Sequence, residues 1–423
     1  MPASPSTARA INDRLALRLL QQEGPLTAGQ LKQLTGLSRP TVADLVERLT
    51  AAGLVEVVGE AGEQRRGPNA KVYGIVADRA HLAALDVRTE SVAVAVADLV
   101  GRVLAEASVP IGDGTGTGPA VEQAVTLVEH VAKEAGADRL HTVGIGAPGL
   151  IDPSSGELRD STGLPEWHRR LVATLQERLP EARVSVENET NLAALAEQRD
   201  GAARDRDTFV LLWLGHAPGA AVVLDGALRR GASGGTGEIG FLPVPGTSAL
   251  PSATDCEGGF HSLASSSAVV ALAAECGIPV APGEQTSAVG VVRAAVSVVR
   301  AAAEAAESRT PGADAPPPPA PAPTARFLDA LADRLAVGVA SVVAILDPGC
   351  VVLGGEVGQA GGEELASRVR DRIARMTPLP TEVRATTLGG GAVLRGALLT
   401  ARDRAQEELF TPGEPPAQPS QGW

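Results

Sequence analysis

Two acids and two amides lie together at residues 187–191, where the chain reads Glu-Asn-Glu-Thr-Asn. They follow the apolar run RVSV and open the alanine-rich run LAALAEQ, a pattern that predicts a strand followed at once by a helix. The acid of most interest is Glu189. At such a junction it can act as a general base, can hydrogen-bond a ligand, or can stabilise the helix N-terminus. The junction alone favours the third role.

The N-terminal segment before these residues has the spacing of a winged helix-turn-helix. Residues 8–22 show helical apolar periodicity, and Thr27 with Gln30 has the spacing of a capping box at the start of a second helix. Gly36 is expected to make the turn, and Ser38 is expected to cap a third helix. The runs LVEVV and KVYGIV, separated by a polar loop, are expected to form the wing. The third helix is predicted to bury Val42, Leu45, Val46 and Leu49.

A head of this type places the second helix of its motif in the major groove, where Arg matches the two acceptors on a guanine edge. We therefore expect DNA contacts from Ser38, Arg39, Thr41, Asp44, Arg48, Arg65, Arg66 and Lys71. Residues 1–80 carry ten basic and eight acidic side chains, whereas the whole chain has a net charge of −13. DNA contact is therefore expected from this segment alone. The competing interpretation is an interaction domain with solvated charges.

The remaining residues alternate between strand-like runs, such as LAALDV, SVAVAVADL and CVVLGG, and helical runs, which indicates an α/β fold. We expect a winged helix-turn-helix domain at 1–80 and an effector and dimerisation body at 81–410. Within the body, a Pro/Ala-rich insert at about 309–325 is expected to be a flexible loop, and a tail at 411–423 is expected to be disordered.

Composition narrows the class of protein. At 423 residues, 44% of them apolar, the chain is long enough for two or three domains with sizeable cores. Cys256, Cys276 and Cys350 lack C-x-x-C spacing, which argues against a disulfide framework or a zinc knuckle. No run of about 18 apolar residues is present, so no membrane span is expected. The first residues lack the apolar core of a signal peptide, and we expect a cytoplasmic protein.

Several motifs beyond residue 80 resemble those of the ROK family, which contains bacterial sugar kinases and sugar-responsive repressors. They are VGIGAPGLID, GLPEWH, VENETNLAALAE, GALRRGASGGTGEIGFLPV and ILDPGCVVLGGEV, in the order seen in that family. The winged head resembles the repressor branch. The resemblance spans roughly residues 80–400. It implies an α/β fold in which the winged helix-turn-helix is followed by a two-lobed actin/hexokinase-like body, with the ligand in the cleft between the lobes.

Set beside this resemblance, the nucleotide motifs are degenerate. The first phosphate hairpin, D-x-G-G-T in the family, reads DVRTE at residues 86–90, so side chains crowd the turn and Glu90 adds negative charge. The second reads GHAPG at 215–219, where Pro218 has no N–H to donate. Glu356 follows the glycines on the adenosine side, and a desolvated acid beside triphosphate is costly. We therefore expect no catalytic residues and no kinase activity. The alternative is a sugar kinase with an appended DNA-binding head.

The sugar side is altered less completely. Glu189 stands where the family motif N-D-x-N has its catalytic Asp, and its carboxylate extends one methylene further. Phe241 replaces a family His, and Gly163 replaces a family Asn. With the flanking motifs in order, a cleft-facing role for Glu189 is favoured over a cap. The resemblance implies effector contacts from Asn188, Glu189, Glu238 and His261.

The structural zinc motif of the family, a His followed by C-x-C-G-x-x-G-C, is also incomplete. This chain has Cys256 alone, and Cys256 with His261 and either Asp255 or Glu257 falls short of four tetrahedral ligands. We expect neither a metal nor another cofactor.

Together these features predict a DNA-binding transcriptional regulator, a repressor, whose body senses a sugar or sugar-like effector. Its expected partners are operator DNA, the effector, and further copies of itself in a homodimer or a dimer of dimers, with no membrane partner. Because the sugar contacts are partly replaced, a modified sugar, a non-sugar effector, and a body that serves only as a dimer scaffold remain open. A protein-interaction module without DNA binding is a further alternative.

Overall fold

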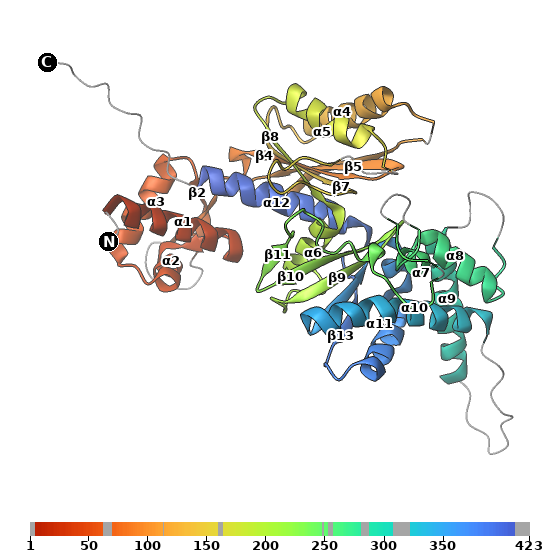
Figure 1. Cartoon of the computed structure of the whole chain (residues 1–423). Coiled ribbons are helices and arrows are strands. Elements are labelled where there is room, and N and C mark those ends of the chain that lie inside the picture. Colours follow the sequence, from red (N-terminus) through yellow and green to blue (C-terminus); the bar gives the residue numbers. More distant parts are fainter. Residues whose placement is uncertain are drawn as a thin grey trace.

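The computed structural model describes residues 5–61, 70–112, 114–159, 164–247, 249–252, 257–280, 287–307 and 322–410. A head of three helices and a small sheet lies at one end of the molecule, next to a body of two lobes (Figure 1). Each lobe is built on a five-stranded sheet. The predicted tail and most of the predicted insert lie outside the described residues. Helix α10 begins at Pro323, so the last residues assigned to the insert are helical.

Local signals define the head. Thr27 and Gln30 form the predicted capping box, in which each side chain accepts a hydrogen bond from the other residue's backbone N–H (3.2 and 2.9 Å). Gly36 ends the second helix with a left-handed φ of 70°, and Ser38 caps the third. The sheet has the order β1-β3-β2, with β2 and β3 antiparallel as a wing. The elements are α1 (Pro5–Glu23), β1 (Leu26–Thr27), α2 (Ala28–Thr35), α3 (Arg39–Ala51), β2 (Val55–Ala61) and β3 (Ala70–Ile75).

The first lobe has the strand order β6-β5-β4-β7-β8, with β4 antiparallel to β5 and parallel to β7. Helices α4 and α5 cover one face of this sheet, and α12 packs on β4 and β7 at the other face. Burial on both faces explains why the central strands are almost wholly apolar. The elements are η1 (Ala77–Arg79), β4 (His81–Val87), β5 (Ser91–Asp98), β6 (Val103–Pro110), α4 (Thr117–Glu134), β7 (Leu140–Ala147), α5 (Trp167–Arg178), β8 (Arg183–Asn188) and α12 (Ala392–Leu409).

The second lobe has the strand order β11-β10-β9-β12-β13, and β12 is parallel to both of its neighbours. Helices α7 to α11 share the apolar core on one face, and α6 packs on β9 and β10 at the other. The elements are α6 (Glu189–Asp200), β9 (Phe209–Leu214), β10 (Pro218–Leu224), β11 (Ala227–Arg229), η2 (Ile239–Phe241), α7 (His261–Ala264), α8 (Ser266–Glu275), α9 (Ala288–Glu307), α10 (Pro323–Leu346), β12 (Cys350–Gly354), α11 (Gly355–Met376), β13 (Glu382–Ala385) and η3 (Gly389–Gly391).

The two lobes meet where α6 packs against α12. The approach is close enough that a Cβ at Gly396 of α12 would collide with the carbonyl oxygen of Leu192 in α6. Because protein interiors leave little room for an added methyl group, only glycine fits this crossing. The pair α6–α12 is therefore the packed joint between the lobes.

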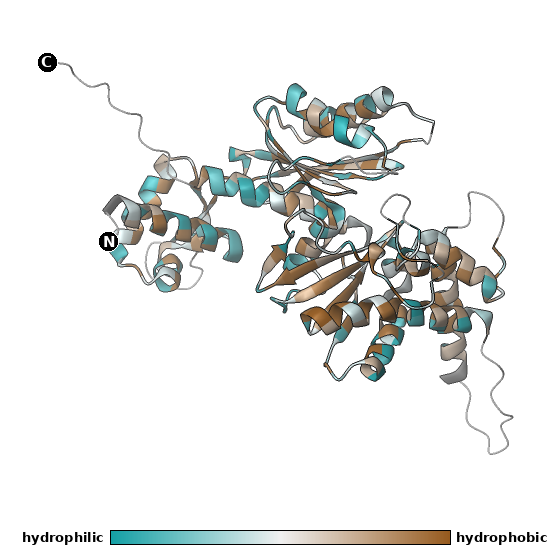
Figure 2. Ribbon diagram, viewed as in Figure 1, coloured by the Kyte–Doolittle hydropathy of each residue, from teal (hydrophilic) through white to brown (hydrophobic). Residues whose placement is uncertain are grey.

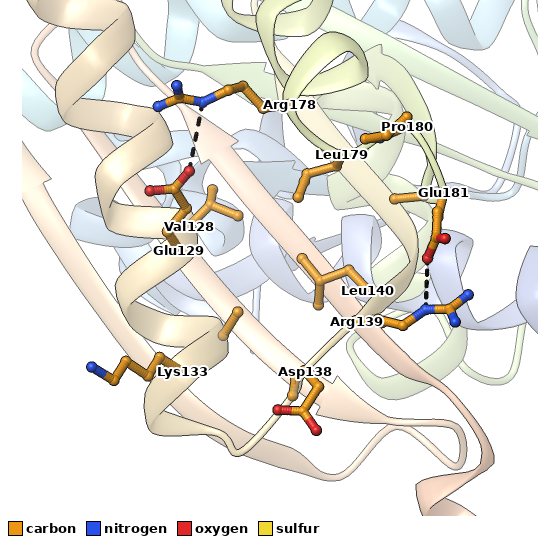
Figure 3. A pocket seen from close by; sticks show the side chains of 13 residues that line it. Val128, Glu129, Lys133, Asp138, Arg139, Leu140, Arg178, Leu179, Pro180 and Glu181 are labelled. Atoms are coloured by element: carbon orange, nitrogen blue, oxygen red, sulfur yellow. Dashed lines mark ion pairs between the residues drawn. The ribbon is translucent and has the colours of Figure 1, made fainter.

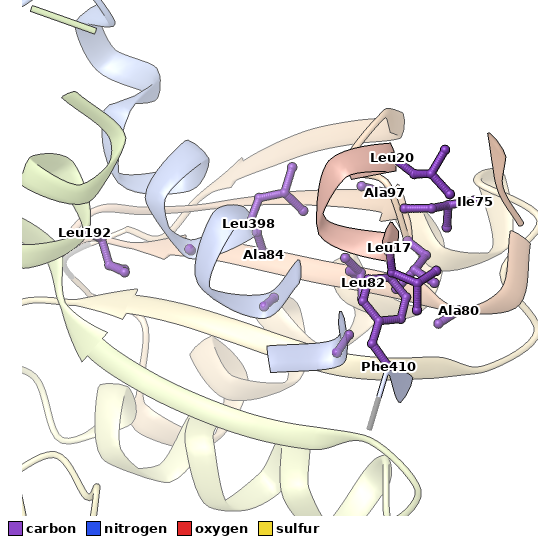
Figure 4. Close-up of a cluster of buried hydrophobic side chains, with 14 of the residues drawn as sticks. Leu17, Leu20, Ile75, Ala80, Leu82, Ala84, Ala97, Leu192, Leu398 and Phe410 are labelled. Atoms are coloured by element: carbon purple, nitrogen blue, oxygen red, sulfur yellow. The ribbon is translucent and has the colours of Figure 1, made fainter. Parts of the chain in front are cut away.

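The head is not separated from the body by a free linker. Leu17 and Leu20 of α1 belong to the same buried cluster as Ile75, Leu82 and Phe410, so one apolar core runs from the head into the first lobe (Figure 4). In Figure 2 the strands of the second lobe are largely hydrophobic, whereas the end of α12 near the head is hydrophilic. This end of α12 carries the polar contacts to the head.

A pair of glutamines adds hydrogen bonds to this shared core. Nε2 of Gln406 in α12 donates to Oε1 of Gln21 in α1 (2.7 Å) and to the carbonyl oxygen of Leu99 (2.9 Å). Nε2 of Gln21 in turn donates to the carbonyl oxygen of Val100 (3.2 Å). The head is thus fixed to the β5–β6 turn and to α12 together. None of the described helices is both long enough and apolar enough to span a bilayer.

Candidate functional site

Asn188 begins the β8–α6 junction as the N-cap of α6. Its Oδ1 accepts hydrogen bonds from the backbone N–H groups of Thr190 (2.9 Å) and Asn191 (3.3 Å). Its Nδ2 donates to the carbonyl oxygen of Gly149 (3.0 Å) and to Oε2 of Glu189 (3.0 Å). The cap of this junction is therefore Asn188, and Glu189 does not have that role.

Glu187, which is not among the predicted contacts, ties the same junction to the loop after β11. Its Oε2 accepts from Nε of Arg230 (2.7 Å), and its Oε1 accepts from Nδ2 of Asn191 (3.0 Å) and from the backbone N–H of Asn188 (3.0 Å). Its place in the sequence beside Glu189 was the only signal of this role. Of the two acids, Glu187 is committed to internal pairs, which leaves Glu189 as the one available to a ligand.

Glu189 is half-buried as a residue, and its carboxyl group lies among charges of both signs. Withdrawal from water is the main reason why its pKa is raised to about 8. The carboxylates of Asp86 and Glu238 act in the same direction, while a hydrogen bond from its own backbone and the guanidinium of Arg88 oppose them. At neutral pH this carboxyl is mostly protonated, so it can donate a hydrogen bond to a hydroxyl oxygen as well as accept one.

Glu238 lies in the glycine-rich loop that follows β11. The backbone N–H of Ala220 in β10 donates to the carbonyl oxygen of Gly237 (2.8 Å), which holds this loop on the sheet. The residue is exposed, yet partial withdrawal of its carboxyl from water raises the pKa of Glu238. The carboxylate of Glu238 helps to raise the pKa of Glu189, and Asn188 donates a hydrogen bond to Glu189. Three of the four predicted effector contacts therefore interact with one another.

His261, the fourth predicted contact, is placed differently. The residue is 5% exposed, and its ring packs edge-on against Phe241 with the centroids 5.0 Å apart. Its Nε2 has no hydrogen-bond partner and lies against Gly240, where a side chain at that position would extend. Burial lowers the pKa of His261, so the ring is neutral. His261 therefore supports the end of the loop that carries Glu238.

The first expected phosphate hairpin, between β4 and β5, holds an arginine where the family has glycine. Arg88 donates through Nε and Nη2 to Oδ2 of Asp86 (3.0 and 2.8 Å), and through Nη1 to the carboxylate of Glu356 at the start of α11. Glu90, the acid expected to face this site, is exposed at the turn. Of the two charged side chains in this turn, Arg88 is the one that pairs with the second lobe. The signal for it was the arginine itself at a position that the family keeps small.

The residues that the structure describes contain no group of three or more His, Cys, Asp or Glu side chains placed to hold a metal ion. Cys256 and Asp255 of the degenerate zinc motif, and Gly163 of the sugar side, fall outside those residues.

In the head, the N-terminus of α3 carries the first predicted DNA contacts. The cap Ser38 and the first helical residue Arg39 are exposed, and Thr41 is half-buried. The hydroxyl groups of Ser38 and Thr41 lie 2.8 Å apart and hydrogen-bond to each other. Lys71 is exposed on β3, on the wing. The structure thus leaves the guanidinium of Arg39 at the tip of the third helix.

Arg48 has an internal partner as well as a surface one. Its Nη2 lies 2.6 Å from Oδ1 of Asp13 in α1, and its Nη1 pairs with Asp44 one helical turn earlier. The pair with Asp13 holds α3 against α1. The pair with Asp44 joins two of the predicted DNA contacts, Arg48 and Asp44, to each other. Arg65 and Arg66 lie outside the described residues.

A separate hollow of about 450 Å³ lies on the first lobe beside α4 and the end of α5 (Figure 3). The ion pairs Arg178–Glu129 (3.6 Å) and Arg139–Glu181 (2.6 Å) cross its lining. It shares no residue with the α6 junction, so it is not part of the candidate site.

Comparison with known families gives a match to the ROK family over residues 82–311 and 319–404, which is most of the chain. The chain belongs to the ROK family. The head matches the MarR family over residues 11–67. This ROK chain is therefore a body of that family with a MarR-type winged helix-turn-helix in front of it, as the sequence motifs predict.

One curated relative is the N-acetylglucosamine repressor of Escherichia coli O6:H1, 25% identical over 244 residues that cover 56% of this chain and 58% of the relative. The match thus spans less than two thirds of that protein. Among solved structures, a ROK family transcriptional regulator described as a homologue of the E. coli MLC protein has a TM-score of 0.69 at 19% identity and covers 96% of this chain and all of its own. The ROK hexokinase of Thermus thermophilus has a TM-score of 0.58 at 28% identity and covers 77% and 99%.

Proposed function

We propose that this ROK protein is a DNA-binding transcriptional repressor whose body senses a sugar or sugar-like effector and transfers no phosphate. The observation that carries the proposal is the exposed N-terminus of α3, with Arg39 at its tip, on a head that shares its core with the body. An exposed arginine at this position of a winged helix-turn-helix is placed to read a base edge. The repressor among the relatives and the regulator among the solved structures support the same function.

We assign the DNA contacts unequally. Arg39 reads bases, and Ser38, Thr41 and Lys71 contact the DNA backbone. Arg48 and Asp44 set the angle of α3 through their mutual ion pair and the pair with Asp13 in α1. The predicted wing contacts Arg65 and Arg66 stay in the proposal on the sequence alone.

The effector binds at the N-terminus of α6, in contact with Asn188, Glu189 and Glu238. A polyol presents hydroxyl groups that both donate and accept hydrogen bonds, and a carboxyl group with a pKa of about 8 can serve either need at neutral pH. His261 contributes by holding the loop of Glu238 in place. Once a ligand covers them, polar groups of this kind discriminate by hydroxyl position, because a ligand that lacks the matching hydroxyl leaves one of them without a hydrogen bond.

The same geometry disfavours phosphoryl transfer. A general base must take the hydroxyl proton, and a carboxyl group with a pKa of about 8 is mostly protonated at neutral pH. Arg88 in the β4–β5 turn and Glu356 at the start of α11 stand at the positions where the family motifs have phosphate and adenosine contacts, and the two side chains pair with each other. The body therefore works as a receptor.

The proposal also includes a homodimer, because winged helix-turn-helix proteins commonly bind two half-sites of an operator with two heads.

The signal passes through α6 and α12. The effector binds at the start of α6, α6 packs on α12, and the far end of α12 holds α1 of the head through Gln406. A ligand shifts such an equilibrium only by its differential affinity for the two arrangements. The effector therefore changes the relation between the two lobes, and with it the spacing of the heads in the dimer.

Footprinting on genomic fragments, with and without a panel of sugars, tests this function. We expect the protein to protect a palindromic site, and we expect one sugar of the panel to abolish this protection. The kinase alternative is tested in parallel by a coupled ATPase assay with the same panel. Sugar-dependent turnover would refute the receptor proposal, and the absence of any protected site would refute the DNA-binding one.

A further inference from the structure

The guanidinium of Arg88 contacts both lobes at the turn between β4 and β5. In addition to the pairs with Asp86 and Glu356, the guanidinium carbon of Arg88 lies 5.9 Å from the ring centroid of Trp213 in β9, within the range of a cation–π contact. Asp86 lies in β4 and Arg88 in the turn that follows it, both in the first lobe, whereas Trp213 and Glu356 belong to the second lobe. A single side chain therefore contacts both lobes.

The turn between β9 and β10 packs closely against two of the groups that contact Arg88. A Cβ at Gly215, in the turn between β9 and β10, would lie 2.7 Å from Nε1 of Trp213 and 2.8 Å from Oε2 of Glu356. Real Cβ atoms do not approach polar atoms so closely, so the turn is packed directly on the ion pair. The two turns and the start of α11 are in contact through the chain's own side chains.

The two arms of the bridge differ in burial. Asp86 is only 5% exposed. Burial raises the pKa of its carboxyl group, and the guanidinium of Arg88 opposes this shift. Separating Arg88 from Asp86 would leave a buried carboxylate without a partner, which is costly. The side chains of Arg88 and Glu356 are 28% and 38% exposed, so the second arm is in contact with water. Solvent-exposed ion pairs are weak and easily screened. The arm to Asp86 is the fixed one, and the arm to Glu356 is the one that can open.

We propose that Arg88 and Glu356 form an ionic latch that holds the two lobes together without a bound nucleotide. When the latch opens, Arg88 stays on Asp86 and the lobes rotate about the packed joint of α6 and α12. A ligand that prefers the open arrangement must overcome the latch, so the latch sets the effector concentration at which the heads respond. Only this last step rests on the proposed function.

The latch is tested by hydrogen exchange on the full chain with neither DNA nor sugar present. The variant Glu356→Gln removes the exposed arm and leaves Asp86 paired. Its matched control is Glu363→Gln, which removes a carboxylate of the same helix that pairs only within the second lobe, with Arg370 (3.2 Å). We expect exchange at residues 88–91 and 213–219 to become about five- to tenfold faster in Glu356→Gln, the factor that about 1–1.4 kcal/mol produces. The control is expected to leave both segments unchanged.

Salt provides a second test that needs no substitution. Raising the ionic strength from 0.1 to 1 M shortens the Debye length from about 10 to about 3 Å. The unsubstituted chain is expected to show the same acceleration at residues 88–91 and 213–219, and Glu356→Gln is expected to show none. If neither the substitution nor salt changes exchange in these segments, there is no latch. That result would leave the proposed function standing, because neither DNA nor effector takes part in the measurement.

Discussion

Replacing Glu189 with glutamine is expected to remove a large part of the pH dependence of stability. The folded chain holds this carboxyl with a pKa of about 8, against an ordinary value of 4.5. Between these two values the folded state keeps a proton that the unfolded state has lost. Stability therefore falls as pH rises through this range, by about 1.4 kcal/mol per pH unit. Glutamine is neutral in both states, so it resembles the protonated carboxyl and contributes no such slope.

The size of the effect follows from the two pKa values. Between pH 6 and 8.5 the linkage amounts to about 2.5 kcal/mol, and solvent contact at this half-buried side chain lowers the expected value to about 2 kcal/mol. This window lies above the sequence pI of about 5.1, so the protein keeps its net negative charge throughout. The free energy of unfolding of Glu189→Gln should rise relative to that of the unsubstituted protein by this amount across the window.

Urea unfolding at several pH values, followed by tryptophan fluorescence and circular dichroism, measures the difference. Taking the difference between the two chains cancels the titration of all other groups. Glu106→Gln, at an exposed position of β6, is the matched control and should run parallel to the unsubstituted protein. If Glu189→Gln also runs parallel, the carboxyl is ionised in the folded state at neutral pH, and its assignment as a hydrogen-bond donor to the effector is wrong.

Three further substitutions test other parts of the structure. Arg39→Ala should weaken binding to the footprinted site by about 1–3 kcal/mol without changing the melting temperature; equal affinity in fluorescence anisotropy would contradict a base contact. Phe410→Ala removes a large side chain from the core shared by head and body and should lower the free energy of unfolding by about 3–5 kcal/mol, whereas an unchanged urea midpoint would mean that this core is not shared in solution. Gly396→Ala forces a methyl group against the backbone of α6 and should destabilise by about 1–3 kcal/mol in thermal melts; a stabilised variant would show that the joint of the lobes is looser than described.

Sequence patterns predict the local features of this chain well, because each depends on neighbouring residues. The capping box of Thr27 and Gln30 and the cap at Ser38 follow from spacing alone, as does the strand-to-helix junction before Glu189. The order of the family motifs adds the two-lobed body. The short edge strands β11 and β13 have no comparable pattern, because their few residues are ordered by pairing with a neighbouring strand.

The partners of long charged side chains could not be predicted from the sequence. Arg88 meets Glu356 across 268 positions of the chain, and no periodicity connects them. Arg48 is a predicted DNA contact on the third helix, and its pairing with Asp13 of α1 is a separate feature that no sequence pattern indicates. His261 was placed by the family motif, while its burial against Phe241 depends on how the loop folds back. In each case the tertiary structure decides what a residue of known type contacts.

The core shared by the head and the first lobe means that residue 80 does not separate two independently stable parts. A fragment that ends there would lack Leu82 and Phe410, which belong to the same buried cluster as Leu17 and Leu20, and would expose those two leucines. We expect such a fragment to aggregate and the whole chain to unfold its head and first lobe in one transition. The same continuity constrains evolution. A new head could not simply be joined to this body, because it would have to match the end of α12, so changes in operator preference are expected to arise by substitutions on the outer face of α3.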